Sequence, residues 1–303
     1  HGLHLVVRAS ASTPTIVSFS AQGLAEELPR LVRLLVEVLQ RPTFPAEELD
    51  KRREQVLGSL AREREETSAR AFAALMRGLY AEGHPLHRRP IEVRENEVRS
   101  LTCEELTDFH AANYGPATVA LAVVGDVEAG HVASLFAEEL AGWIGAGEAV
   151  FAIDDQRVTE PPEQRIQISD RPNIDVYLGH CGRLLRGDAD YPASVLANSC
   201  LGQSTLTSRL GVAVRDGAGL TYGIYSRFFG TLHVAGPWAT ALGVSADNLD
   251  RAVELSLEVI ARYVDEGPTE EELADERSAL AGAYRVGLAT NSGIARELVT
   301  AVT

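Results

Sequence analysis

Arg215 and Tyr222 are the residues of this sequence whose types and spacing best suit chemistry. They stand seven residues apart in the run Arg-Asp-Gly-Ala-Gly-Leu-Thr-Tyr-Gly, which spans residues 215–223. An arginine keeps its charge in a protein and offers a rigid fork of donors, and a tyrosine offers a directed hydroxyl. Such a pair can hold a carbonyl or stabilise a developing oxyanion. The alternative is structural: Arg215 caps the turn, and Tyr222 packs between a sheet and a helix.

This turn must be held in place by the elements around it, which the sequence predicts to be amphipathic helices and short strands. Apolar residues at helical spacing predict a helix over Leu24–Gln40. Pro45 opens a second helix that runs to about Thr67, and capping boxes that begin at Thr102 and Thr269 predict two more. The mixture predicts an α+β fold with helices on one face of a sheet. Further helices are predicted over residues 69–80, 129–143, 191–201 and 248–265, and strands over residues 117–124, 165–169, 175–179, 222–229 and 232–239.

The composition argues against some classes of protein. The 303 residues carry a net charge of −15, whereas nucleic-acid-binding proteins normally present a basic face. No stretch approaches the roughly 18 continuous apolar residues of a membrane span. The three cysteines, Cys103, Cys181 and Cys200, form no CxxC pair, so reduced thiols and a cytoplasmic location are expected.

An internal repeat divides the chain. Residues 28–39 resemble residues 249–260, and residues 47–58 resemble residues 271–282, at offsets of 221 and 224. Two consecutive matches at nearly the same offset predict two copies of one domain. The segment 145–163 is rich in Gly, Pro and acidic residues and predicts the linker, so the expected domains are 1–150 and 151–303. The offsets place the opening of the first copy before His1 and the end of the second after Thr303.

The order and spacing of six segments resemble the pitrilysin/insulinase family of zinc metallopeptidases, which includes the mitochondrial processing peptidases. The resemblance implies tandem homologous α+β domains, each a mixed and mostly antiparallel sheet with helices packed on one face. Such domains face each other and enclose a peptide. The segments are RPTFPAEELDKRREQVL, LYAEGHPLHRRP and SLTCEELTDFHAANYGPATVALAVVGDV in the first copy, and YLGHCGRLLRGDADYPASVLANSCLG, SRLGVAVRDGAGLTYGIYS and DEGPTEEELADERSALAGAY in the second.

The zinc site that the resemblance implies is not completed by this sequence. In the family an inverted motif, H-x-x-E-H, and a later glutamate hold zinc and supply a general base. None of the eight histidines stands in such a motif, and His84-Pro-Leu-His87 predicts a loop. Ser59 aligns with the later glutamate, and a serine hydroxyl is a poor zinc ligand. Glu54 or Glu63 replaces it only with a shifted register. We therefore expect the family's zinc to be absent from this chain.

The resemblance also implies a role for Arg215 and Tyr222. In active members an arginine and a tyrosine at this spacing reach across the chamber, orient the scissile carbonyl and stabilise the oxyanion. On this basis we expect Arg215 and Tyr222 to act on the transition state. Gly219, Leu220 and Thr221, in the turn between them, are expected to contact the peptide substrate.

Three functions are compatible with the sequence, and the first is our main prediction, because a structural scaffold needs neither Arg215 nor Tyr222. In the first, the protein is a zinc-dependent metalloendopeptidase, with this chain supplying the Arg/Tyr half and an upstream segment or a partner subunit supplying the zinc. In the second, it is a non-catalytic core subunit, similar to the family relatives that scaffold respiratory complexes. In the third, it is a peptide-binding scaffold. The expected partners are a peptide and a peptidase-family subunit in a homo- or hetero-oligomer, with no nucleic acid and no membrane span.

Overall fold

The computed structural model describes residues 4–10, 13–146, 157–158 and 163–302. Most of the predicted linker at 145–163 lies outside these residues, so the division into two domains stays a prediction. The described elements form a mixed α+β fold, as predicted. The first half contains β1 (His4–Ser10), β2 (Thr13–Gln22), α1 (Leu28–Gln40), α2 (Ala46–Glu65), α3 (Thr67–Leu79), α4 (Ile91–Ser100), α5 (Cys103–Asn113) and α6 (Ala129–Glu139). The second half contains β3 (Asn173–His180), α7 (Tyr191–Asn198), β4 (Thr221–Phe228), β5 (Trp238–Ser245), α8 (Leu249–Glu266), α9 (Glu270–Gly287) and α10 (Asn291–Val302).

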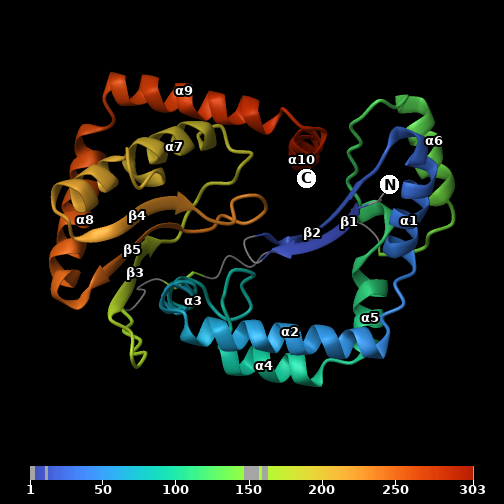
Figure 1. Cartoon of the computed structure of the whole chain (residues 1–303), viewed down its shortest axis with the longest axis horizontal. Coiled ribbons are helices and arrows are strands. Elements are labelled where there is room, and N and C mark those ends of the chain that lie inside the picture. Colours follow the sequence, from blue (N-terminus) through green and yellow to red (C-terminus); the bar gives the residue numbers. More distant parts are fainter. Residues whose placement is uncertain (1–3, 11–12, 147–156, 159–162, 303) are drawn as a thin grey trace.

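Two antiparallel sheets organise the chain. β1 pairs with β2, and the second sheet has the order β3-β5-β4, so β5 is its central strand. Leu242 of β5 lies opposite Val176 of β3 and Ile224 of β4. In Figure 1 this sheet lies with α7, α8 and α9, while α1 and α6 lie beside the β1–β2 pair at the opposite end of the molecule. α2 and α4 run along each other at the lower edge of the view.

The main core lies between the three-stranded sheet and α8. Ala252, Ser256, Val259 and Tyr263 are the buried residues of α8, at a spacing that places them on one side of a helix. Tyr263 donates a hydrogen bond from its hydroxyl to the Ala197 carbonyl at 2.7 Å, which joins α8 to α7. A second core joins α1 to α6. It contains Leu28, Val32, Leu35, Val36 and Leu39 of α1, together with Val132 and Phe136 of α6.

The other face of the three-stranded sheet is joined to α3 at β3. The Ser68 hydroxyl lies 3.2 Å from the Tyr177 hydroxyl, which lies 3.3 Å from the hydroxyl of Tyr225 on β4. Phe72 packs on Tyr177 with ring centroids 5.4 Å apart. Burial is the main cause that raises the pKa of Tyr177 to about 12. Helix α3 of the first half therefore contacts the sheet of the second.

Helix starts follow the predicted capping chemistry. The Thr102 side chain accepts a hydrogen bond from the backbone of Glu105, and the Glu105 side chain accepts one from the backbone of Thr102. Thr269 and Glu272 repeat this arrangement at the start of α9. Helix α7 is shorter than predicted, because the chain passes at Ser199 into a π-helical turn that ends at Gln203. β1, β2, α4 and α10 have no counterpart among the predicted elements.

Three predicted strands are wrong. Residues 119–124 and 165–169 form no strand, and Leu121 and Val123 are 44% and 36% exposed. An apolar or alternating run becomes a strand only when a second strand completes its hydrogen bonds, and among the described residues neither segment has one. Residues 231–234 form a turn before β5 begins at Trp238. This connection needs a glycine, because a Cβ on Gly236 would lie 1.8 Å from the Phe229 carbonyl oxygen.

No helix among the described residues is both long and apolar enough to cross a membrane. All three cysteines lie in the described ranges, where none forms a disulfide, and Cys200 is buried.

Acid is expected to weaken the attachment of α9. Arg209 holds the pKa of Glu272 at about 2, below its ordinary 4.5, through hydrogen bonds of 2.6 and 2.7 Å. Because the folded pKa is lowered, this carboxylate stabilises the fold above pH 4.5, and the contribution disappears as the pH falls toward 2. Urea unfolding at pH 7, 4 and 3 measures the loss. The Glu272→Gln variant should show a smaller change with pH; an unchanged pH dependence would contradict the prediction.

Candidate functional site

Arg215 and Tyr222 are in direct contact. Arg215 belongs to a π-helical turn, Gly211–Gly217, and Tyr222 is the second residue of β4. The Arg215 Nε donates a hydrogen bond to the Tyr222 carbonyl at 3.1 Å, and its Nη1 pairs with Asp216 at 2.6 Å. The guanidinium therefore braces the backbone that carries the tyrosine. The Tyr222 residue itself is 96% exposed, so its ring is not packed between a sheet and a helix as the structural alternative requires.

The turn between these two residues is built around Gly219 and Thr221. Gly219 has a φ of 65°, in the left-handed region that favours glycine. Leu220 packs against the main core. Thr221 is buried, and its hydroxyl donates to the Gly243 carbonyl at 2.6 Å. The side chains of Leu220 and Thr221 thus hold the turn in place, and contact of these three residues with a peptide stays a prediction.

A hollow of 410 Å³ opens beside Tyr222. In the sheet Gly243 lies opposite Asp175 on one side and Gly223 on the other. A Cβ placed on Gly243 would lie 3.4 Å from the Asp175 Oδ1, so the absence of a side chain at Gly243 leaves space beside the Asp175 carboxylate. The Thr67 hydroxyl donates to that carboxylate from the start of α3. The residues around the hollow are Thr67, Arg171, Pro172, Asn173, Asp175, Tyr222, Gly223, Gly243 and Val244.

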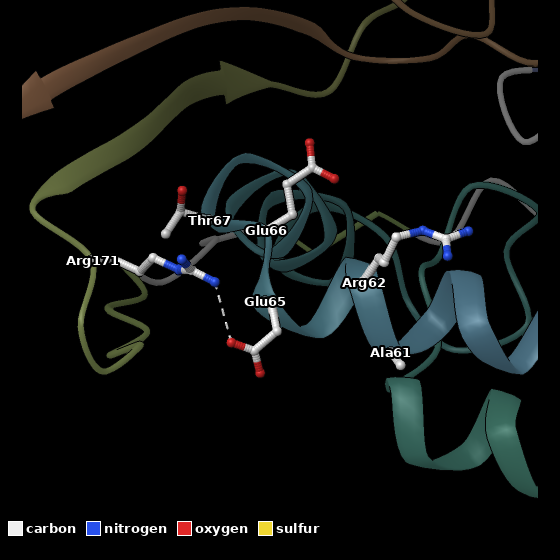
Figure 2. A pocket seen from close by; sticks show the side chains of 6 residues that line it. All are labelled: Ala61, Arg62, Glu65, Glu66, Thr67 and Arg171. Carbon is white, nitrogen blue, oxygen red and sulfur yellow. Dashed lines mark hydrogen bonds and ion pairs between the residues drawn. The ribbon is translucent and has the colours of Figure 1, made fainter.

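A second, shallower depression of 630 Å³ adjoins the first, because Thr67 and Arg171 line both. Figure 2 shows its side chains: Arg62 and Glu65 come from the end of α2, Glu66 follows that helix, and Arg171 reaches toward Glu65. The Arg171 Nη2 and the Glu65 carboxylate lie 3.3 Å apart. The combined surface carries both signs of charge, two glycines and one exposed aromatic ring. Such a surface suits a polypeptide better than a ligand of a single charge.

Sequence reasoning missed Thr67, Arg171 and Asp175. Thr67 and Asp175 stand 108 residues apart, and each is an ordinary residue at the edge of an element. Neither carries a motif, so only their juxtaposition in space indicates a site.

The described residues do not provide the set of zinc ligands that the resembled family uses. Among the described residues, no group of three His, Cys, Asp or Glu side chains could hold a metal ion. The Ser59 hydroxyl donates to the Gln55 carbonyl of its own helix at 3.0 Å and accepts from Arg62. Glu63 is engaged by Arg94 at 2.5 Å. His84 and His87 belong to a loop, where the Leu86 amide donates to the His84 Nδ1 at 3.1 Å. These residues do not fit a zinc ion.

Comparison with known proteins shows which family this chain belongs to. Residues 100–280 match the family described as the peptidase M16 inactive domain. The chain belongs to the M16 peptidase family. This confirms the resemblance to the pitrilysin/insulinase peptidases that the sequence indicated. A crystal structure of a peptidase M16 inactive domain from Pseudomonas fluorescens superposes with a TM-score of 0.82 at 27% identity, over 98% of this chain and 69% of that one.

Two relatives of this chain carry names that describe different kinds of protein. An uncharacterized zinc protease of Mycobacterium tuberculosis is 26% identical over 278 residues, which cover 90% of this chain and 62% of the relative. This M16 chain thus spans less than two thirds of the length of that protein. Subunit 1 of the human mitochondrial cytochrome b-c1 complex is 28% identical over 153 residues, which cover 49% of this chain and 31% of the subunit. One relative is thus named a protease and the other a subunit of a larger complex.

Proposed function

We propose that this M16 chain is a non-catalytic unit that holds an extended polypeptide segment at the hollow beside Tyr222, within an assembly with another M16 subunit. The observation that carries the proposal is the hollow itself. It is lined by Gly223 and Gly243, charges of both signs and an exposed tyrosine, and among the described residues no group of three His, Cys, Asp or Glu side chains could hold a metal ion. The inactive-domain description of the matched family supports the same conclusion.

The similarity to a cytochrome b-c1 subunit favours a role for this chain as a subunit of an oligomer. A unit without metal ligands contributes to peptide handling by position and binding rather than by chemistry of its own. The two domains expected at 1–150 and 151–303 then act as one scaffold, since α3 contacts β3 across that boundary.

Replacing Tyr222 with alanine is expected to weaken peptide binding about 10-fold, because an exposed tyrosine at the rim of a hollow supplies large contact area at low entropic cost. Fluorescence anisotropy with labelled, unstructured 15-residue peptides measures the affinity. Tyr284→Ala is the matched control, because Tyr284 is 56% exposed on α9 and is not among the residues that line either depression. Equal losses in the two variants, or no binding by the unaltered chain, would rule out this site.

A second function is favoured by the contact between Arg215 and Tyr222. The 3.1 Å hydrogen bond fixes the backbone of an exposed tyrosine, the arrangement expected of a group that reaches into a neighbouring zinc site. In this function the chain supplies the Arg/Tyr half of a metalloendopeptidase, and another M16 unit holds the zinc. Both functions use one surface, and they differ in whether Tyr222 is needed for turnover or only for affinity.

A further inference from the structure

The hollow beside Tyr222 contains a single carboxylate, that of Asp175. Asp175 lies on β3, opposite Gly243 of the central strand β5. Its Oδ2 accepts a hydrogen bond from the Thr67 hydroxyl at the start of α3. Its Oδ1 accepts none from the described residues and lies 3.4 Å from the position that a Cβ on Gly243 would occupy. One oxygen is therefore held by α3, and the other borders the space over Gly243.

The space over Gly243 is open but limited. Apart from its chain neighbours, no described atom other than the Asp175 Oδ1 lies within 4 Å of a Cβ placed on Gly243. Two residues further along the same face, Tyr177 and Tyr225 flank Ala241, and their hydroxyls lie 3.3 Å apart. Aromatic rings therefore stand in the next row of the sheet, and the 410 Å³ hollow suits one side chain of a bound polypeptide together with its backbone.

The charge of Asp175 is not balanced by the cations in the described part of the chain. The charged residues that line the hollow are Asp175 and Arg171. Figure 2 shows the Arg171 guanidinium directed toward Glu65, and the two groups lie 3.3 Å apart. No ion pair from the described residues reaches Asp175, which is half-buried. A carboxylate at such a position is costly without a cation, and Thr67 supplies only a neutral donor.

The rim of the hollow adds a second feature that attracts a cation. Tyr222 is 96% exposed, and the face of a tyrosine ring attracts a lysine or arginine head group within about 6 Å. The net charge of −15 favours the approach of cations to the surface in general. A neutral donor on the ligand would bond to the Asp175 Oδ1 but would leave its charge uncompensated.

We propose that Asp175 makes the hollow selective for a polypeptide segment that carries a lysine or arginine, whose head group binds the Asp175 Oδ1 beside the Tyr222 ring. This selectivity rests on the proposed function, because it concerns the polypeptide that the same hollow holds. The aliphatic stem of the bound side chain lies over Gly243, where the sheet has no side chain of its own. Asp175 is thus a specificity-determining residue.

Fluorescence anisotropy with the 303-residue chain tests the selectivity. Three labelled, unstructured 15-residue peptides without other charges differ only at one central position, which is lysine, arginine or norleucine. We expect the lysine and arginine peptides to bind about 10-fold more tightly, because norleucine keeps the stem but lacks the charge-assisted hydrogen bond. This comparison uses the unaltered chain and does not depend on the folding of a variant.

Two substitutions locate the selectivity. Asp175→Asn should bind all three peptides equally, because it removes the charge. Its urea unfolding midpoint checks that the fold is kept, since the amide oxygen can still accept from Thr67. Asp108→Asn is the matched control: it removes the same charge from an exposed position on α5 that lines neither depression, and the preference should persist.

The results that would overturn the selectivity differ from those that would overturn the proposed function. Equal binding of the three peptides by the unaltered chain, with Tyr222→Ala still weakening that binding, overturns the selectivity alone. A preference that survives in Asp175→Asn, or that falls equally in Asp108→Asn, belongs to the net charge of the chain and also overturns the selectivity. No binding of any peptide overturns both.

Discussion

Under the second proposed function, in which this chain supplies the Arg/Tyr half of a metalloendopeptidase, Tyr222→Phe is expected to lower turnover about 10²-fold in an assembly with a zinc-bearing M16 subunit, the scale of losing one donor to an oxyanion. The substitution keeps the ring and removes only the hydroxyl. Because the Arg215 bond goes to the backbone carbonyl of Tyr222, the turn should keep its structure. Steady-state cleavage of a fluorogenic peptide measures the effect, and the loss should fall on kcat rather than on KM.

Arg215→Ala tests the other member of the pair. It should cost at least as much turnover, since it also releases the backbone of Tyr222 and the pairing with Asp216. Tyr284→Phe, on α9, is the control and should leave turnover unchanged. Unchanged turnover in both Tyr222→Phe and Arg215→Ala would assign the pair to binding or to the turn alone, and the non-catalytic function would then account for the surface.

Arg209→Ala is expected to lower the free energy of unfolding by about 2–3 kcal/mol, because it breaks a largely buried pair and leaves the Glu272 carboxylate without its cation. The Arg209 side chain is 21% exposed and that of Glu272 is 29% exposed. Arg209 also donates to the Gly267 carbonyl at 2.9 Å and lies 4.9 Å from the centre of the Tyr263 ring. One side chain thus joins α8, α9 and the segment before Gly211–Gly217, the turn that carries Arg215.

Urea unfolding followed by circular dichroism measures this loss. Arg251→Ala provides the comparison, since its pairs with Glu254 and Glu258 are exposed and surface pairs are worth at most about 1 kcal/mol. Similar losses in the two variants would mean that the Arg209 cluster does not hold α8 and α9 together.

The elements that the sequence predicts well are those whose signals are local. The apolar stripe of α1 and the capping boxes at Thr102 and Thr269 act within one or two turns of a helix, so the residues that decide the structure are close in the chain. The predicted strand at residues 117–124 failed for the opposite reason. A strand is completed by a partner elsewhere in the chain, and composition alone does not say whether that partner is present.

The same distinction between local signals and long-range contacts applies to the candidate site. The amino-acid sequence by itself determined the family, the position of the Arg215–Tyr222 turn and the need for Gly219, because all three depend on residue types at short spacing. Only the tertiary structure brought Thr67 and Asp175 together, and only it left Tyr222 exposed beside them. Burial and long-range contact decide these features, and both arise when distant segments pack.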